Sequence, residues 1–163
     1  MAKSVVGIIM GSESDLEVMR GASKVLKDFG VPCEIRIISA HRTPDVMANY
    51  AATAAKRGLK IIIAGAGGSA HLPGMTASHT TLPVLAVPVK KAGHDHEALW
   101  SNIKMPNGIP LATMPENGAL NAGLMAIEIL AINDAALAKK YASYRQKMHA
   151  EVLASDKKLA GGK

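Results

Sequence analysis

Short apolar runs alternate with amphipathic stretches along most of this chain. The apolar runs are rich in β-branched residues and predict strands at 5–10, 33–38, 60–64, 84–89 and 109–113. Helical spacing of apolar residues predicts helices at 16–29, 43–58, 70–80, 97–103, 119–132 and 135–153. Such regular alternation with short linkers predicts an α/β fold with one parallel, doubly wound sheet and helices on both faces.

The last predicted helix carries one apolar stripe on an otherwise charged surface. The stripe recurs at spacings of three and four residues and consists of Leu137, Tyr141, Tyr144, Met148 and Val152. Because earlier helices already cover a five-stranded sheet, we expect this stripe to pack on a neighbouring subunit. Packing on its own domain is the alternative.

Composition places the chain among compact intracellular proteins. Its 163 residues are enough for one domain, and 3% aromatic content predicts an aliphatic core in which nine methionines fill gaps. The single cysteine, Cys33, excludes an intrachain disulfide and suits a reducing compartment. The first apolar run, at 5–10, is too short for a signal peptide or membrane span, so we expect a cytoplasmic protein without membrane contact.

The net charge of +6 does not by itself indicate nucleic acid binding. Seven of the 19 basic residues lie in the last 25 residues and are spread along a helical pattern, which is typical of a solvated helix face. Aromatic residues that could stack on bases are nearly absent. We therefore expect no nucleic acid partner.

Three segments that follow predicted strands carry the chemistry. The first, at 11–15, contains Gly11, Ser12, Ser14 and Asp15 and opens a helix, where free amides and the helix dipole suit a phosphate. Asp15 would repel phosphate and is assigned to ribose hydroxyls or a ring amine. Plain N-capping by Ser12 or Ser14 explains the same residues.

The second segment is Ser39-Ala40-His41-Arg42-Thr43-Pro44, at the end of the second predicted strand. His41 can act as a general acid and base near neutral pH, and Arg42 can bind a phosphate or carboxylate through two hydrogen bonds. In a parallel sheet, ligands bind outside the carboxyl ends of the strands, so we expect this segment to form part of a site.

The third segment, at 64–75, is rich in glycine and includes Gly67, Gly68, Ser69, His71 and Leu72. Glycines let a backbone approach a ligand closely and direct amides at an anion. Tight helix–sheet packing is the alternative reason for them.

Together these segments resemble the PurE family of de novo purine synthesis, and its class I form, the N5-carboxyaminoimidazole ribonucleotide mutases, in particular. The class II form, which carboxylates aminoimidazole ribonucleotide directly with CO2, usually has Ala-Gly-Arg-Ser-Asn where this chain is glycine-rich. The likeness covers residues 4–132. Its matching stretches are 10–15, 39–45, 64–75, 82–84, 87–89, 105–110 and 121–124.

The resemblance implies a fold, an assembly and a reaction. The fold is a flavodoxin-like three-layer αβα sandwich, with one domain over 1–163, a core at about 4–132 and a helical extension at about 134–158. The assembly is a homo-octamer. The reaction removes the N-linked carboxylate as CO2 and adds it to C4 of the same imidazole, with His41 as the proton shuttle and without cofactor or metal.

The resemblance also distributes the substrate among the site residues. Ser14 and Arg42 would hold the 5′-phosphate, and Ser12 and Asp15 would contact the ribose. The migrating carboxylate would be surrounded by Gly67, Gly68 and Ser69, with His71 and Leu72 nearby. The complete set of expected substrate-binding residues is Gly11, Ser12, Ser14, Asp15, Ser39, Ala40, Arg42, Gly67, Gly68, Ser69, His71 and Leu72.

Partners and rival functions follow from the same resemblance. The stretches around Met105 and Asn121 would close the pocket from a neighbouring subunit, and the enzyme that makes the substrate with ATP would make transient contact. His79 and His149 are expected to be structural. The chain could instead be a direct aminoimidazole ribonucleotide carboxylase, or a PurE-like nucleotide-binding protein without catalysis.

Several positions depart from the family pattern. Ser69 replaces the usual Ala, Ala86 replaces the usual Gly, and segments 92–101 and 114–118 differ more extensively. The first of these segments contains His94-Asp95-His96, which has too few ligands for a metal site and no partner cluster, so we expect a polar surface loop.

Overall fold

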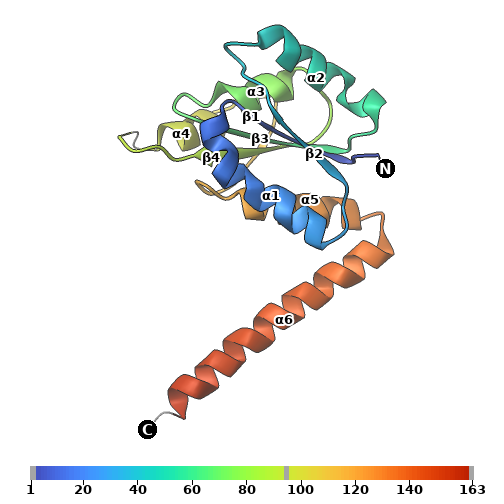
Figure 1. Cartoon of the computed structure of the whole chain (residues 1–163), viewed down its shortest axis with the longest axis vertical. Helices are drawn as coiled ribbons and strands as arrows, with labels where there is room; N and C mark the ends of the chain where they lie inside the picture. Colours follow the sequence, from blue (N-terminus) through green and yellow to red (C-terminus); the bar gives the residue numbers. More distant parts are fainter. Residues whose placement is uncertain (1–2, 94–95, 162–163) are drawn as a thin grey trace. The chain divides into compact units, whose positions relative to one another are not determined.

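The computed structural model describes residues 3–93 and 96–161 and contains one five-stranded parallel sheet (Figure 1). Its strand order is β2-β1-β3-β4-β5, so the chain winds from the centre first to one edge and then to the other. The strands are β1 (Val6–Met10), β2 (Cys33–Ile37), β3 (Ile61–Gly67), β4 (Val84–Val89) and β5 (Ala112–Thr113). The α/β, doubly wound, parallel fold is confirmed.

The strands β1 and β4 are more deeply buried than the edge strand β2. Every residue of β1 and β4 is buried, which explains their continuous apolar sequences. In β2, by contrast, Ile35 and Ile37 are 41% and 52% exposed. The edge strand therefore presents apolar side chains outward.

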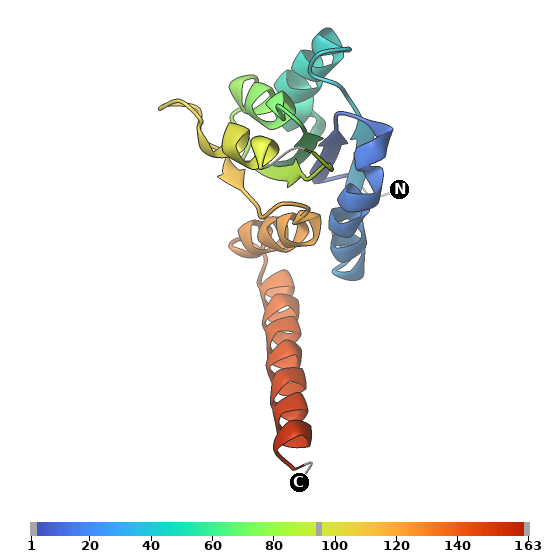
Figure 2. The same ribbon diagram turned by 90° about the vertical axis from the view of Figure 1, so that its left-hand side faces the viewer.

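Helices cover both faces of the sheet, as three-layer packing requires (Figure 2). On one face, residues of α2 (Pro44–Arg57), α3 (His71–Ser78) and α4 (Glu97–Ile103) share a core cluster with Ile9 and Ile62. On the other face, α1 (Leu16–Asp28) packs against the beginning of α5 (Ala119–Ala131), where Gly21 and Gly123 allow backbones to approach.

The helix ends follow local chemistry. Pro44 occupies the first turn of α2, and Gly58 ends that helix with φ of 98°, a left-handed conformation that glycine adopts without strain. Ser12 caps a short 3₁₀ helix (Glu13–Asp15) that leads into α1 by accepting a hydrogen bond from the Ser14 amide.

Two strands differ from their predicted bounds by more than one residue. β3 extends through Gly67 instead of ending at Ala64, because Gly65 to Gly67 pair with Val87 to Val89 of β4. β5 contains only Ala112 and Thr113, which pair with Leu85 and Ala86. Pro110 cannot donate to a ladder and so disfavours the longer strand predicted at 109–113.

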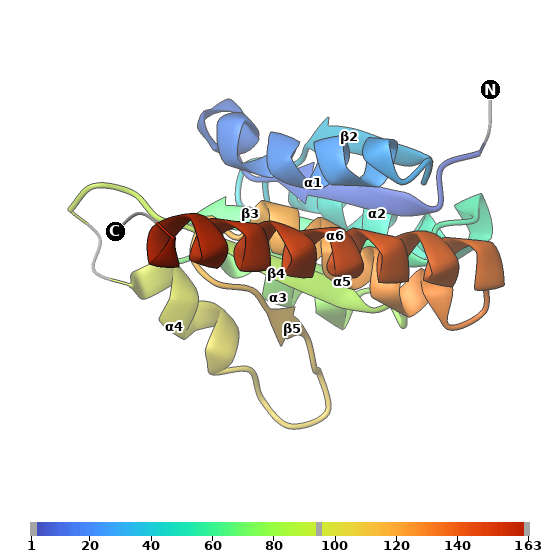
Figure 3. The same cartoon turned by 90° about the horizontal axis from the view of Figure 1, so that it is seen from below.

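The chain divides into two compact units, residues 1–126 and 127–163. In the second unit, Asp134 caps α6 (Ala135–Ala160) by accepting from the Leu137 amide at 2.9 Å. Figure 3 shows α6 as one continuous helix. It extends beyond the predicted end at 153 because no glycine or proline interrupts it before Gly161. Within the described ranges, no helix combines the length and apolarity that a bilayer span requires.

Candidate functional site

A cavity of about 380 Å³ lies at the carboxyl ends of β1, β2 and β3. This is where ligand sites of parallel α/β sheets occur. Its lining brings the three segments of the sequence together, and of the expected site residues only Ser14 and Gly68 do not line it. The lining residues are Gly11, Ser12, Asp15, Ser39, Ala40, His41, Arg42, Ala66, Gly67, Ser69, Ala70, His71, Leu72 and Lys91.

The loop after β1 is ordered by its own side chains. The Ser12 hydroxyl accepts from both the amide and the hydroxyl of Ser14, at 3.3 and 3.1 Å. Asp15 is only 1% exposed although it is charged, and its carboxylate lies 3.4 Å from the Ser14 hydroxyl. The capping role that the sequence allowed for Ser12 is thus present, and a buried carboxylate forms part of the cavity wall.

The loop after β2 folds into a tight turn that aims Arg42 across the sheet edge. The Ser39 hydroxyl accepts from the Arg42 amide at 3.2 Å and from its Nε at 3.4 Å. The Arg42 Nη2 donates to the Gly11 carbonyl at 2.7 Å, which joins the loops after β2 and β1. The guanidinium is therefore fixed in place while the residue as a whole remains exposed.

His41 and His71 form a hydrogen-bonded pair at the cavity. His41 Nε2 lies 2.8 Å from His71 Nδ1, and the rings meet edge to face with centroids 4.9 Å apart. Two imidazoles in this contact need one donor and one acceptor nitrogen, so the tautomer of one ring sets that of the other. His71 is thereby placed to orient the ring that the sequence assigned to proton transfer.

The glycines of the third segment serve different purposes. A Cβ at Gly65 would meet the Met19 sulfur at 2.3 Å, so this glycine serves tight packing against α1. Gly68 has φ of 59° with open space around a Cβ, and Ala70 also has a left-handed conformation with φ of 44°. Gly65 therefore confirms the tight-packing explanation, whereas close approach of the backbone to a ligand stays a prediction.

Lys91 is a site residue that the sequence analysis missed. Its ammonium forms an ion pair with the Asp15 carboxylate at 3.2 Å and donates to the Ser14 hydroxyl at 3.2 Å. The sequence did contain a signal for Lys91. This residue follows Val89 at the end of β4 and so lies at the same edge of the sheet as the three predicted segments.

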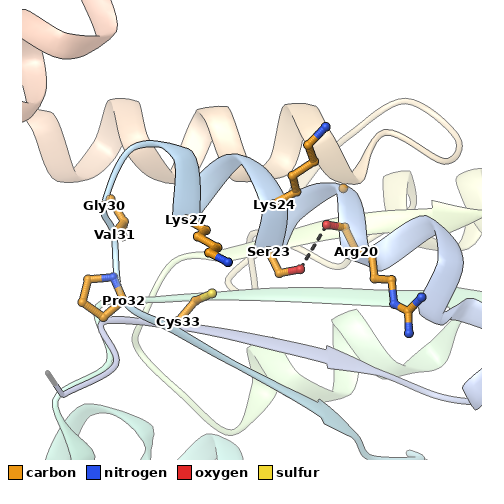
Figure 4. Close-up of a pocket in the computed structure, with 9 residues that line it drawn as sticks. Arg20, Ser23, Lys24, Lys27, Gly30, Val31, Pro32 and Cys33 are labelled. Atoms are coloured by element: carbon orange, nitrogen blue, oxygen red, sulfur yellow. Dashed lines mark hydrogen bonds between the residues drawn. The ribbon is translucent and has the colours of Figure 1, made fainter. Parts of the chain in front are cut away.

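A larger hollow of about 850 Å³ lies elsewhere, between α1 and the start of β2 (Figure 4). Its lining combines the cations Arg20, Lys24 and Lys27 with Cys33, whose burial raises the pKa of its thiol. Cys33 begins β2, whereas His41 follows the end of that strand. The hollow therefore lies at the amino end of the sheet, opposite the histidine pair, and we assign the chemistry to the smaller cavity.

The two segments that depart most from the family pattern contact one another. His96 Nδ1 lies 2.9 Å from the Glu116 carboxylate. Just before the first segment, the Lys90 amide donates to Asn117 Oδ1 at 2.9 Å. His94 and Asp95, two of the three residues considered for a metal, lie outside the described residues. Elsewhere in the described chain, no group of three or more His, Cys, Asp or Glu side chains could hold a metal ion.

Comparison with known sequences finds one matching family and many relatives. The model of the family described as AIR carboxylase matches residues 5–151. The N5-carboxyaminoimidazole ribonucleotide mutase of Thermotoga maritima is 52% identical over 155 residues, which are 94% of this chain and 91% of that protein. The mutase of Aquifex aeolicus is 57% identical over 140 residues, 85% of this chain and 83% of that one.

A longer eukaryotic protein is also similar. The phosphoribosylaminoimidazole carboxylase of Saccharomyces cerevisiae is 52% identical over 160 residues, but these cover 98% of this chain and only 28% of the yeast protein. This chain thus spans less than a third of that relative.

Solved structures agree with the sequence relatives. A variant of PurE2 from Treponema denticola superposes with a TM-score of 0.86 at 28% identity, covering 97% of this chain and 99% of that one. The PurE of the same organism gives 0.85 at 29% identity, covering 94% and 97%. With a family model matching most of its length and close relatives of nearly its own length, the chain belongs to the AIR carboxylase family, the family of the PurE proteins.

Proposed function

We propose that this protein is an N5-carboxyaminoimidazole ribonucleotide mutase of purine biosynthesis. The observation that carries the proposal is the histidine pair, His41 and His71, set in one cavity with a fixed arginine and a buried carboxylate. Bacterial relatives with this name are 52–57% identical and cover most of the chain.

The reaction needs one proton to be given and one to be taken. When the N–C bond of the N5-carboxylate breaks, CO2 leaves and the amine nitrogen gains a proton. When C4 then attacks the same CO2, a C–C bond forms and C4 loses its proton to restore the aromatic ring. One imidazole, that of His41, can serve as the acid in the first half and the base in the second.

Besides moving the proton, the site must bind the substrate and retain CO2. Arg42 binds the 5′-phosphate together with Ser14, and Asp15 and Ser12 contact the ribose. Gly67, Gly68 and Ser69, with Leu72 nearby, surround the carboxylate. Keeping CO2 beside C4 raises its effective concentration, and this avoids a separate activation of CO2.

We further propose that the active form is a homo-octamer in the cytoplasm. On α6, the outer part of the apolar stripe is exposed, with Met148 at 44% and Val152 at 68%. A neighbouring subunit that covers this stripe would remove apolar surface from water. The stretches around Met105 and Asn121 then complete the pocket of the neighbour, and the ATP-dependent enzyme that makes the labile substrate contacts the assembly transiently.

An assay without ATP tests the function. The protein receives N5-carboxyaminoimidazole ribonucleotide in one reaction and aminoimidazole ribonucleotide with bicarbonate in another, and the C4-carboxylated product is followed in both. A mutase makes product from the first substrate at a rate that does not depend on added bicarbonate.

Two other results would contradict the mutase function. Product formed only from the second mixture, in proportion to CO2, identifies a direct carboxylase, the activity in the name of the yeast relative. Ribonucleotide binding without turnover of either substrate identifies a non-catalytic binding protein.

A further inference from the structure

Lys91 reaches the cavity from a strand that contributes none of the expected site residues. It follows the end of β4, and its ammonium contacts Asp15 and Ser14, which follow β1. Because β3 lies between β1 and β4 in the sheet, the side chain must cross the end of β3 to make these contacts.

Gly67 makes that crossing possible. A Cβ at Gly67 would lie 2.6 Å from Lys91 Cε and 3.0 Å from Cδ, much closer than carbon atoms pack. It would also lie 2.9 Å from the Val89 carbonyl. The absence of a side chain at the end of β3 therefore leaves a path for the lysine stem.

The ammonium has donor capacity left for a ligand. A lysine ammonium carries three N–H donors, and Asp15 and Ser14 account for two of them. The side chain of Lys91 is 39% exposed, whereas that of Asp15 is 2% exposed. The pair thus has a buried anionic end and a cationic end that faces the cavity it lines.

The charge balance favours an anion at this position. Alone, the buried carboxylate of Asp15 would repel a phosphate at the helix start, which is why the sequence analysis assigned it to the ribose. The Lys91 ammonium neutralises that carboxylate, so the site keeps the net positive charge of Arg42. Its contact with the Ser14 hydroxyl puts the charge next to the proposed phosphate position.

We propose that Lys91 is a substrate-binding residue whose ammonium contacts the 5′-phosphate of the ribonucleotide, beside Ser14 and Arg42. This inference rests on the proposed function, because it takes the ligand of the cavity to be a ribonucleotide. Asp15 then has the additional task of holding the ammonium in place.

The test compares Lys91→Met with Lys91→Arg and with the control Lys90→Met. Methionine keeps a flexible stem over Gly67 but removes the charge, and Lys90 pairs with Glu116 at 4.0 Å outside the cavity lining. Affinity is measured by calorimetry for aminoimidazole ribonucleotide and for the corresponding nucleoside without phosphate, with thermal unfolding as a check on folding.

Loss of a charge-assisted hydrogen bond to phosphate should weaken ribonucleotide binding by Lys91→Met about tenfold to a hundredfold. Nucleoside affinity should stay the same, Lys91→Arg should recover most of the loss, and Lys90→Met should bind both ligands as the wild type does. Unchanged ribonucleotide affinity in Lys91→Met would overturn the inference. So would an equal loss for nucleoside and ribonucleotide, because that result indicates a structural effect on Asp15 alone.

Failure of the proposed function gives a different result. In that case the wild type itself neither converts nor binds the ribonucleotide, and the same variants are titrated with inorganic phosphate. Wild-type phosphate binding that Lys91→Met loses would still support an anion site at Lys91, and binding that Lys91→Met keeps would exclude it.

Discussion

At the scale of single residues, neighbours decide what each titratable group can do. His41 is paired with His71, Arg42 is fixed by Gly11 and Ser39, and Asp15 is neutralised by Lys91. None of these pairs is adjacent in the sequence. The types of the predicted site residues could therefore be read from the sequence, but their partners depended on the fold.

A second residue cluster, outside the site, predicts a dependence of stability on acid. The Glu34 carboxylate accepts from Tyr50 Oη and from Arg57, each at 2.7 Å. Burial acts to raise the pKa of Glu34, but the hydrogen bonds and the Arg57 charge outweigh it and hold that pKa below its ordinary value of 4.5. Burial, together with the hydrogen bond to Glu34, raises the pKa of Tyr50, so the phenol stays neutral.

Because the folded state favours ionised Glu34, this carboxylate stabilises the fold fully above pH 4.5. The stabilisation is lost as the pH falls through the lowered pKa of Glu34 in the folded state. We expect Glu34→Gln to lower the free energy of unfolding at pH 7 by up to about 1 kcal/mol, since the pair is partly exposed. The difference from wild type should shrink below pH 4.5. Urea unfolding at pH 7 and pH 3.5 measures this, and an equal difference at both values would contradict it.

At the scale of elements, glycines decide how closely the layers pack. Gly7 in β1 lies under α2, and a Cβ there would lie 2.2 Å from Tyr50 Oη. The absence of this side chain lets Tyr50 pass over β1 and reach Glu34 of β2. Gly7 in β1 thus permits the hydrogen bond between Tyr50 of α2 and Glu34 of the edge strand β2.

Gly7→Ala should lower the free energy of unfolding by about 1–3 kcal/mol, the usual cost of overpacking a well-packed core. In a Tyr50→Phe background the hydroxyl that clashes is gone, so the same change should cost less. Thermal or urea unfolding of the four proteins in this cycle measures the coupling. Equal costs in both backgrounds would show that Tyr50 is not what the new methyl group meets.

Some elements are easier to predict from the sequence than others. The bounds of β4 and α4 were predicted to the residue, because apolar runs and helical spacing mark them clearly. Gly65 to Gly67 were expected in a loop, since glycine usually breaks strands, but pairing with β4 keeps them in β3. Lys91 was missed for a related reason, because its role arises from a side chain that crosses a neighbouring strand.

At the scale of the whole molecule, the exposed apolar side chains are where other copies would bind in the proposed oligomer. The stripe on α6 ends in exposed Met148 and Val152, and β2 presents Ile35 and Ile37 at the sheet edge. The octamer and the packing of the last helix on a neighbour stay predictions. Exposed apolar residues in the second unit provide a way to test them.

Met148→Glu places a charge in the stripe and should shift the mass measured by light scattering from that of the octamer to smaller species, because burying an unpaired charge is costly. The matched control is Gln146→Glu, which adds the same charge to the same exposed helix outside the stripe. An octamer that persists in Met148→Glu would argue against contact through this stripe, and a dissociated control would show a general effect of charge.

The central claim is that His41 moves the proton during carboxylate transfer, and His41→Asn tests it most directly. Single-turnover conversion of N5-carboxyaminoimidazole ribonucleotide is compared in the wild type, in this variant and in His79→Asn, whose histidine lies outside the cavity lining. The account predicts that His41→Asn slows conversion at least about a hundredfold while ribonucleotide affinity is kept, and that His79→Asn matches the wild type. Conversion by His41→Asn at a rate near that of the wild type would contradict it.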